Sequence, residues 1–202
     1  YIKMTTSSNF GNAFSVLIAS IFLPFLPMLP LHLLIQNLLY DISQLSIPLD
    51  SMSKEFLKKP RKWAAAGISR FMIFIGPISS IFDVTTFLGL WFIFKANSPA
   101  TQSLFHTGWF IEGLISQVLI VHMIRTEKVP FIQSRATKPV IFLTALISII
   151  GLAIPYTVFG QKIGLVPLPW TYFPFLLITL VSYCALTQLV KNWYIKRFKS
   201  WL

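Results

Sequence analysis

Four polar side chains that carry oxygen atoms lie inside apolar stretches of the first 41 residues. Asn37 and Asp41 are four residues apart in "PLHLLIQNLLYD", residues 30–41, so both project from one face of a helix. Asn9 and Asn12 are three residues apart in "SSNFGN", residues 7–12, and share a face of the preceding segment. One carboxylate and three amides are oxygen ligands of the kind that hard cations prefer. The spacing therefore predicts a site for Mg²⁺ or Ca²⁺.

The low charge of this set favours Mg²⁺ over Ca²⁺, because Mg²⁺ keeps several of its water ligands. The absence of intramembrane Cys or His pairs argues against zinc or copper. The eleven residues from Pro30 to Asp41 span about 16 Å of helix, which places Asp41 near the middle of a hydrocarbon core about 30 Å thick. The alternative is that Asp41 is protonated or paired and joins helices by hydrogen bonds.

Composition places these residues in a membrane, because 55% of the chain is hydrophobic and only 11% is charged, with a mean hydropathy of +0.71. In soluble domains, about a quarter of all residues are charged. The apolar residues form six blocks, each long enough to cross a bilayer. The sequence therefore predicts an all-α membrane protein with a single transmembrane domain over residues 1–202, whose helices lie at about 1–22, 30–48, 68–94, 108–124, 140–159 and 173–190.

Lysine and arginine are distributed unevenly between the two sides of this predicted bundle. Fifteen of the 17 lie in segments on one side, and only Lys95 and Lys162 lie on the other. Loops with an excess of basic residues stay in the cytoplasm, so both termini are predicted to be cytoplasmic. The net charge of +11 then indicates topology and contact with anionic lipid headgroups, and not nucleic acid as a partner. Four aromatic residues are expected at the outer boundary of the membrane: Trp91, Trp109, Trp170 and Tyr172.

Two further acidic residues, Asp83 and Glu112, lie inside the third and fourth predicted helices. A carboxylate near the bilayer centre costs at least about 2.5 kcal/mol, so it normally faces a cation, a water cavity or the protein interior. Gly76 and Pro77 precede Asp83 and could unwind the helix so that it offers carbonyl ligands. Asp83 and Glu112 are therefore secondary candidates for metal binding or for the ion path, with helix-packing hydrogen bonds as the alternative.

Several longer motifs carry a resemblance to a known family. "SSNFGN" at 7–12, "FLPMLPLHLLIQNLLYDISQLSIPLD" at 25–50 and "RFMIFIGPISSIFDVTTF" at 70–87 resemble the carboxy-terminal membrane part of the magnesium-importing P-type ATPases. "GWFIEGLISQVLIVHMIRTEKVPFIQS" at 108–134 and "LTQLVK" at 186–191 extend the resemblance over nearly the whole chain. It implies that the six predicted helices correspond to transmembrane helices five to ten. It also implies ATP-driven magnesium uptake by a multi-pass protein of the bacterial inner (plasma) membrane.

The sequence is also similar, more distantly, to the calcium-pumping ATPases. Asn9, Asn37 and Asp41 match ion ligands of that family. Asn12 and Tyr40 depart from it, because the calcium pumps have glutamate and threonine there. The departures argue against a two-calcium site and favour a single, less charged ion site, in agreement with the charge of the ligand set.

Motifs for ATP chemistry do not occur in these residues. "DKTGT" for phosphorylation, "TGE" for dephosphorylation and the phosphate loop "GxxxxGK[ST]" are all absent. The family resemblance therefore implies an ATPase whose ATP-binding domains, and the aspartyl-phosphate formed there, lie upstream of Tyr1, and we expect no ATP hydrolysis by this segment alone. The alternative from another class is a freestanding six-helix membrane channel or assembly protein.

Overall fold

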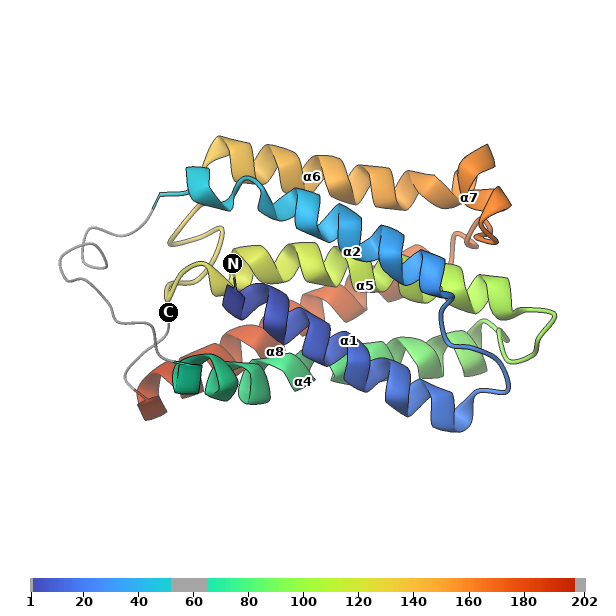
Figure 1. The fold of residues 1–202 in the computed structure, drawn as a ribbon, viewed down its shortest axis with the longest axis horizontal. Coiled ribbons are helices and arrows are strands. Elements are labelled where there is room, and N and C mark those ends of the chain that lie inside the picture. The colour runs from blue at the N-terminus through green and yellow to red at the C-terminus, as the bar shows by residue number, and fades with distance from the viewer. Residues whose placement is uncertain (1, 52–64, 199–202) are drawn as a thin grey trace.

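The computed structural model describes residues 2–51 and 65–198, and the described part is helical, without a named strand. The predicted all-α class is therefore confirmed. Short elements join the longer helices: η1 (Ile47–Leu49), the π-helical η2 (Gly89–Ile93), η3 (Ile154–Tyr156) and α7 (Val158–Lys162). The long helices of the described residues are α1 (Ile2–Phe22), α2 (Pro30–Gln44), α4 (Ala65–Leu88), α5 (Gln102–Ile124), α6 (Lys138–Ala153) and α8 (Tyr172–Phe198) (Figure 1).

Four helices of the described residues are long and apolar enough to cross a membrane: residues 68–93, 102–124, 138–156 and 172–198. They correspond to α4 with η2, α5, α6 with η3, and α8. The helix α2 has only 15 residues, and α1 carries a polar first half with the sequence "KMTTSSN". The structure thus supports a chain with several membrane-crossing helices, and crossing by α1 and α2 stays a prediction.

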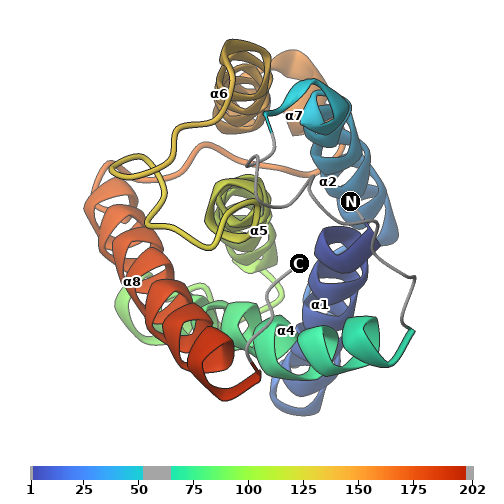
Figure 2. The same cartoon turned by 90° about the vertical axis from the view of Figure 1, so that its left-hand side faces the viewer.

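The helix α5 runs through the middle of the bundle. In Figure 2 it lies inside a ring formed by α1, α2, α6, α8 and α4. In the most apolar 18-residue stretch of α5, 83% is buried inside the protein. In the corresponding stretch of α8, only 28% is buried. Trp109, Phe110 and Leu114 on α5 belong to its buried side chains. The polar residues of α5 between His106 and His122 are buried, so they face protein and not lipid.

Close packing of α1 against α4 fixes the rotation of α1. A Cβ atom added to Gly11 would lie 3.0 Å from the carbonyl oxygen of Gly76 and 2.3 Å from Oγ of Ser79, so only glycine fits without displacement. The Ser80 hydroxyl also donates to the Gly11 carbonyl at 3.1 Å. The predicted opening of the helix at Gly76 and Pro77 is wrong, because α4 remains helical through both residues.

Several helix ends differ from the predicted ones, and α6, for example, ends at Ala153 instead of Phe159. The helix α2 ends at Gln44 instead of Pro48, α5 begins at Gln102 instead of Gly108, and α8 continues to Phe198 instead of Val190. The extension of α8 has a specific cause in Lys191, which is buried. Its ammonium donates to carbonyl oxygens in the last turn of α5 and in the loop that follows, and such cations stabilise a helix carboxy-terminus. The acceptors are Met123 at 3.0 Å, Thr126 at 3.3 Å and Lys128 at 3.0 Å.

Candidate ion-binding site

The helices α1 and α2 are consecutive and run in opposite directions (Figures 1 and 2), with α1 packed mainly against α4 and α2 packed against α5 and α6. Thr5 of α1 donates a hydrogen bond to Oε1 of Gln44 of α2 at 3.1 Å, and this bond fixes their relative height. Asn9 is one helical turn beyond Thr5, and Asp41 is about one turn before Gln44. Because the helices are antiparallel, Asn9 and Asp41 lie at similar depth in the bundle.

The four primary candidates differ in their surroundings. Asn9 and Asp41 are exposed, whereas Asn12 and Asn37 are half-buried. Buried atoms of both half-buried amides, Nδ2 of Asn12 and Oδ1 of Asn37, have no hydrogen-bond partner among the described residues. The structure thus brings the two pairs to one level, and it does not join them to each other by hydrogen bonds within the described part of the chain.

The exposure of Asp41 follows from the register of α2. One face of α2 is buried through His32, Gln36, Tyr40, Ser43 and Gln44. Asp41 falls on the opposite stripe, where Leu34, Leu38 and Leu45 are also exposed. Asn37 lies between the two faces. In the described structure the Asp41 carboxylate therefore points away from α5, on a face that leucines otherwise occupy.

Asp83 of α4 is held by neighbours on two other helices. Its side chain is 3% exposed, and its Oδ2 atom accepts a hydrogen bond from the Ser15 hydroxyl of α1 at 2.6 Å. Its Oδ1 atom accepts from the indole N–H of Trp109 of α5 at 2.8 Å. Trp109 and Tyr172, which were expected in an aromatic belt, do not face lipid, because they are 2% and 0% exposed inside the bundle. Asp83 therefore joins α1, α4 and α5 at one point.

Glu112 is a second buried carboxyl group beside Asp83. It is 1% exposed on α5, and its electrostatic interaction with Asp83 shows that the two groups are neighbours. Neither carboxylate oxygen of Glu112 makes a hydrogen bond of standard geometry with a described residue. Two acidic groups thus meet in the apolar interior of the bundle.

A small cavity of about 20 Å³, lined by both polar and apolar side chains, lies next to Asp83, with room for about one water molecule or one small ion. Asn12 and Asp83 both line it, so the structure brings a primary and a secondary candidate together. Gln117 of α5 also lines the cavity, is 5% exposed and has no partner for its amide atoms among the described residues. The remaining polar lining consists of Ser7, Ser8, Ser79, Ser116 and Tyr183.

Sequence reasoning missed three of these groups. Ser15 continues the polar stripe of α1, three residues after Asn12, and this spacing was a usable signal. Gln117 was not selected, because it is five residues from Glu112 and falls on another part of the α5 surface. The role of Trp109 had no signal in the sequence, since a Trp near a predicted helix end usually indicates an interface.

An all-helical bundle with carboxyl and amide groups buried between apolar helices defines a helical membrane protein of the kind that handles ions. The family model described as "Cation transporting ATPase, C-terminus" matches residues 25–193. The chain belongs to this family.

Curated relatives cover the chain along its whole length. It is 63% identical over 201 residues to the magnesium-transporting ATPase, P-type 1, of Salmonella typhimurium strain LT2, which includes 100% of this chain. It is 59% identical over 198 residues, or 98% of this chain, to the protein of that name from Escherichia coli strain K12. The chain spans 22% of the length of each of these relatives. These comparisons confirm the resemblance to the carboxy-terminal part of magnesium-transporting P-type ATPases.

Proposed function

We propose that this chain is the ion-translocating membrane part of an ATP-driven magnesium importer of the P-type, and that it forms one transmembrane domain over residues 1–202. The observation that supports the proposal is the Thr5–Gln44 hydrogen bond, from which we infer that Asp41 of α2 and Asn9 of α1 lie at similar depth. Relatives that bear the name of magnesium-transporting ATPases support the choice of ion. ATP binding and hydrolysis belong, in this proposal, to domains upstream of Tyr1, since the chain spans 22% of its relatives' length.

Asp41 is the charged ligand in this proposal, and Asn37, Asn9 and Asn12 are the neutral ones. The substrate is Mg²⁺, which keeps part of its water shell and therefore needs few protein charges. A carboxylate on an exposed stripe of leucines is unfavourable in lipid. The face of α2 that carries Asp41 is therefore covered by another segment of the pump, which also closes the site from lipid.

Asp83 and Glu112 are secondary members of the ion path in this proposal. Asp83 shares its cavity with Asn12, so an ion held by Asn12 comes within reach of the Asp83 carboxylate. Glu112 does not line that cavity, and its contribution comes through its neighbour Asp83. The hydrogen bonds from Ser15 and Trp109 to Asp83 favour the alternative, a freestanding channel or assembly protein in which these polar groups only join helices.

The proposed topology has six crossings, corresponding to transmembrane helices five to ten, with both termini in the cytoplasm. The positions of basic residues in the described part of the chain support this topology. The end of α5, the following loop and the start of α6 contain Arg125, Lys128, Arg135 and Lys138. We call this end of the bundle the basic end. Lys95 and Lys162 belong to the opposite end, so the basic end faces the cytoplasm and its anionic lipid headgroups. The bacterial sources of the relatives support the inner (plasma) membrane as the location.

The test is growth of a bacterial strain that lacks its own magnesium importers, in medium with low magnesium. The full-length protein with Asp41→Asn is expected to lose growth rescue while it still reaches the membrane, because the only charged ligand is gone. Glu127→Gln is the matched control, since Glu127 is an exposed carboxylate remote from the site. Rescue by Asp41→Asn at the wild-type level would contradict the ligand assignment. Magnesium uptake that continues after ATP depletion would instead favour the channel.

A further inference from the structure

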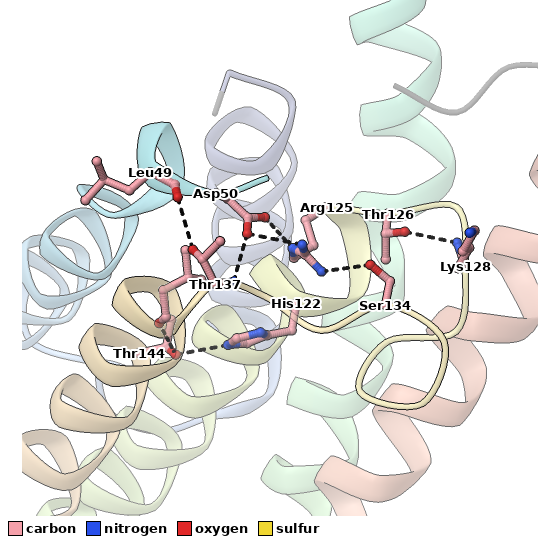
Figure 3. Close-up of polar contacts among 10 residues, drawn as sticks. Leu49, Asp50, His122, Arg125, Thr126, Lys128, Ser134, Thr137 and Thr144 are labelled. Carbon is pink, nitrogen blue, oxygen red and sulfur yellow. Dashed lines mark hydrogen bonds and ion pairs between the residues drawn. The ribbon is translucent and has the colours of Figure 1, made fainter. Parts of the chain in front are cut away.

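Three helical elements meet at one carboxylate at the basic end of the bundle. Asp50 follows η1, the short turn that continues the chain after α2. Arg125 is the carboxy-terminal cap residue of α5, and Thr137 is the amino-terminal cap residue of α6. Figure 3 shows the Asp50 side chain pointing toward both of them. We call this contact the Asp50 junction.

Both oxygens of Asp50 are hydrogen-bonded within the junction. The Arg125 guanidinium donates through Nε to Oδ2 and through Nη2 to Oδ1, the latter at 3.1 Å, so the ion pair is bidentate. The backbone N–H of Thr137 donates to Oδ1 at 3.0 Å. Two further bonds close the network: Thr137 Oγ1 to the Leu49 carbonyl at 3.1 Å and Arg125 Nη1 to Ser134 Oγ at 3.2 Å (Figure 3).

The electrostatics of the junction suit the helix ends that it joins. The guanidinium of Arg125 lies at the carboxy-terminus of α5, where a positive charge is favourable, and the carboxylate of Asp50 lies at the amino-terminus of α6, where a negative charge is favourable. The side chains of Arg125 and Asp50 are only 8% and 14% exposed. Water and salt screen such a shielded bidentate pair less than they screen a surface ion pair.

The junction lies on the chain directly after the helix that carries the proposed ligands. Asp50 is nine residues beyond Asp41, and α2 ends between them at Gln44. Uncharged polar contacts also tie α2 to its neighbours, among them Thr5 to Gln44, Gln36 to the Phe110 carbonyl at 3.5 Å and His32 to the Ile163 carbonyl. The Asp50 junction adds an ion pair with low solvent exposure to these contacts.

We propose that Asp50 and Arg125 are positioning residues for ion binding, because they hold the basic end of α2 against α5 and α6. This inference rests on the proposed function, in which Asn37 and Asp41 bind Mg²⁺. The orientation of Asp41 on the edge of α2 depends on the tilt and rotation of that helix. Outer residues that orient metal ligands typically change metal affinity about 10- to 100-fold when they are removed, and the distance of the junction from Asp41 indicates the lower end of that range.

The experiment measures magnesium uptake by cells that lack their own importers and that express the full-length protein, as a function of external magnesium. Asp50→Asn keeps an oxygen that accepts from the Thr137 N–H but removes the negative charge of the ion pair. Arg125→Gln removes the positive charge of the same pair. Each is expected to raise the KM for magnesium about tenfold, with the maximal rate per pump unchanged. The double variant is expected to be no worse than the more impaired single variant, since both remove the same pair.

Two comparisons separate positioning from mere stability. The conservative variant Asp50→Glu retains the charge and is expected to keep part of the magnesium affinity that Asp50→Asn loses. The control variant Glu127→Gln removes an exposed carboxylate in the α5–α6 loop and is expected to behave as wild type. A wild-type KM in Asp50→Asn, or a fall in pump level with no change in KM, would overturn the positioning role. If Asp50→Asn does not reach the membrane, Arg125→Lys decides by the same KM criterion, because it keeps the charge and loses the bidentate geometry.

The wild-type protein provides the test of the underlying function. If the full-length wild-type protein shows no ATP-dependent magnesium uptake, the proposed function fails. If the wild type takes up magnesium and Asp50→Asn has the same KM, only the positioning role fails.

Discussion

Replacing Trp109 with Phe tests whether the buried carboxylate of Asp83 holds the bundle together. The indole N–H of Trp109 donates to Asp83 Oδ1 at 2.8 Å, and both side chains are at most 3% exposed. Phe preserves most of the aromatic packing against Phe87, whose ring centroid lies 4.7 Å from that of Trp109. The substitution therefore removes mainly the donor, while the Ser15 hydroxyl still serves the other oxygen of Asp83.

The expected loss of stability follows from the energy of hydrogen bonds to charged groups. Such bonds contribute about 1.5–3 kcal/mol, and double-mutant cycles within membranes give at most about 1.7 kcal/mol per pair. A loss of about 2 kcal/mol in the free energy of unfolding is therefore expected for Trp109→Phe, since a small packing loss adds to the lost bond. Ser15→Ala is expected to cost a similar amount through Oδ2 of Asp83.

The assay is equilibrium unfolding of the full-length protein in mixed detergent micelles. Trp170→Phe is the matched control, because Trp170 is 86% exposed. The double variant with Asp83→Asn measures the coupling, which is expected to fall once the carboxylate has been neutralised. Equal stability of Trp109→Phe and Trp170→Phe, or the same loss with and without the Asp83 carboxylate, would refute the reasoning.

Three further predictions concern the helix contacts. Gly11→Ala places a Cβ 3.0 Å from the Gly76 carbonyl oxygen and is expected to cost about 1–3 kcal/mol of unfolding free energy, which the same unfolding assay measures. Lys191→Met removes a donor to three carbonyl oxygens and is expected to cost about 2 kcal/mol, whereas Lys196→Met at an exposed position is expected to cost little. Burial raises the pKa of Asp50, but hydrogen bonds from Arg125 and Thr137 and the charge of Arg125 outweigh it and hold the pKa below its usual value of 3.8. The stabilisation by Asp50 is therefore complete above about pH 4 and is lost as the pH falls through the lowered pKa of Asp50. The difference in unfolding free energy between wild type and Asp50→Asn should stay constant near neutral pH and shrink only in acid.

Much of the fold could be predicted from hydrophobicity alone. Long apolar blocks separated by polar loops predict helices, and the described chain has a helix in each predicted block. Helix ends were predicted less well, because they depend on tertiary contacts. The helix α8 continues past Val190 since Lys191 bonds carbonyl groups of α5 and of the α5–α6 loop, and a basic residue at that position indicates a loop when hydropathy is considered alone.

The candidate site was predictable in its residue types and only partly in its arrangement. Spacing along one helix gives the shared face of Asn37 and Asp41, but it does not tell how α1 rotates against α4. That rotation is set by the close contact of Gly11 with Gly76, and it turns Asn12 toward the cavity beside Asp83. Because the covering segment of Asp41 is not among these residues in the proposed pump, the described structure leaves its carboxylate on an exposed face.

The most direct test of magnesium translocation through Asp41 is ATP-driven magnesium transport by the full-length protein reconstituted into lipid vesicles. Wild type and Glu127→Gln are expected to move magnesium across the vesicle membrane after ATP is added. Asp41→Asn is expected to incorporate equally and to move none. Magnesium transport by Asp41→Asn at the wild-type rate would contradict the account.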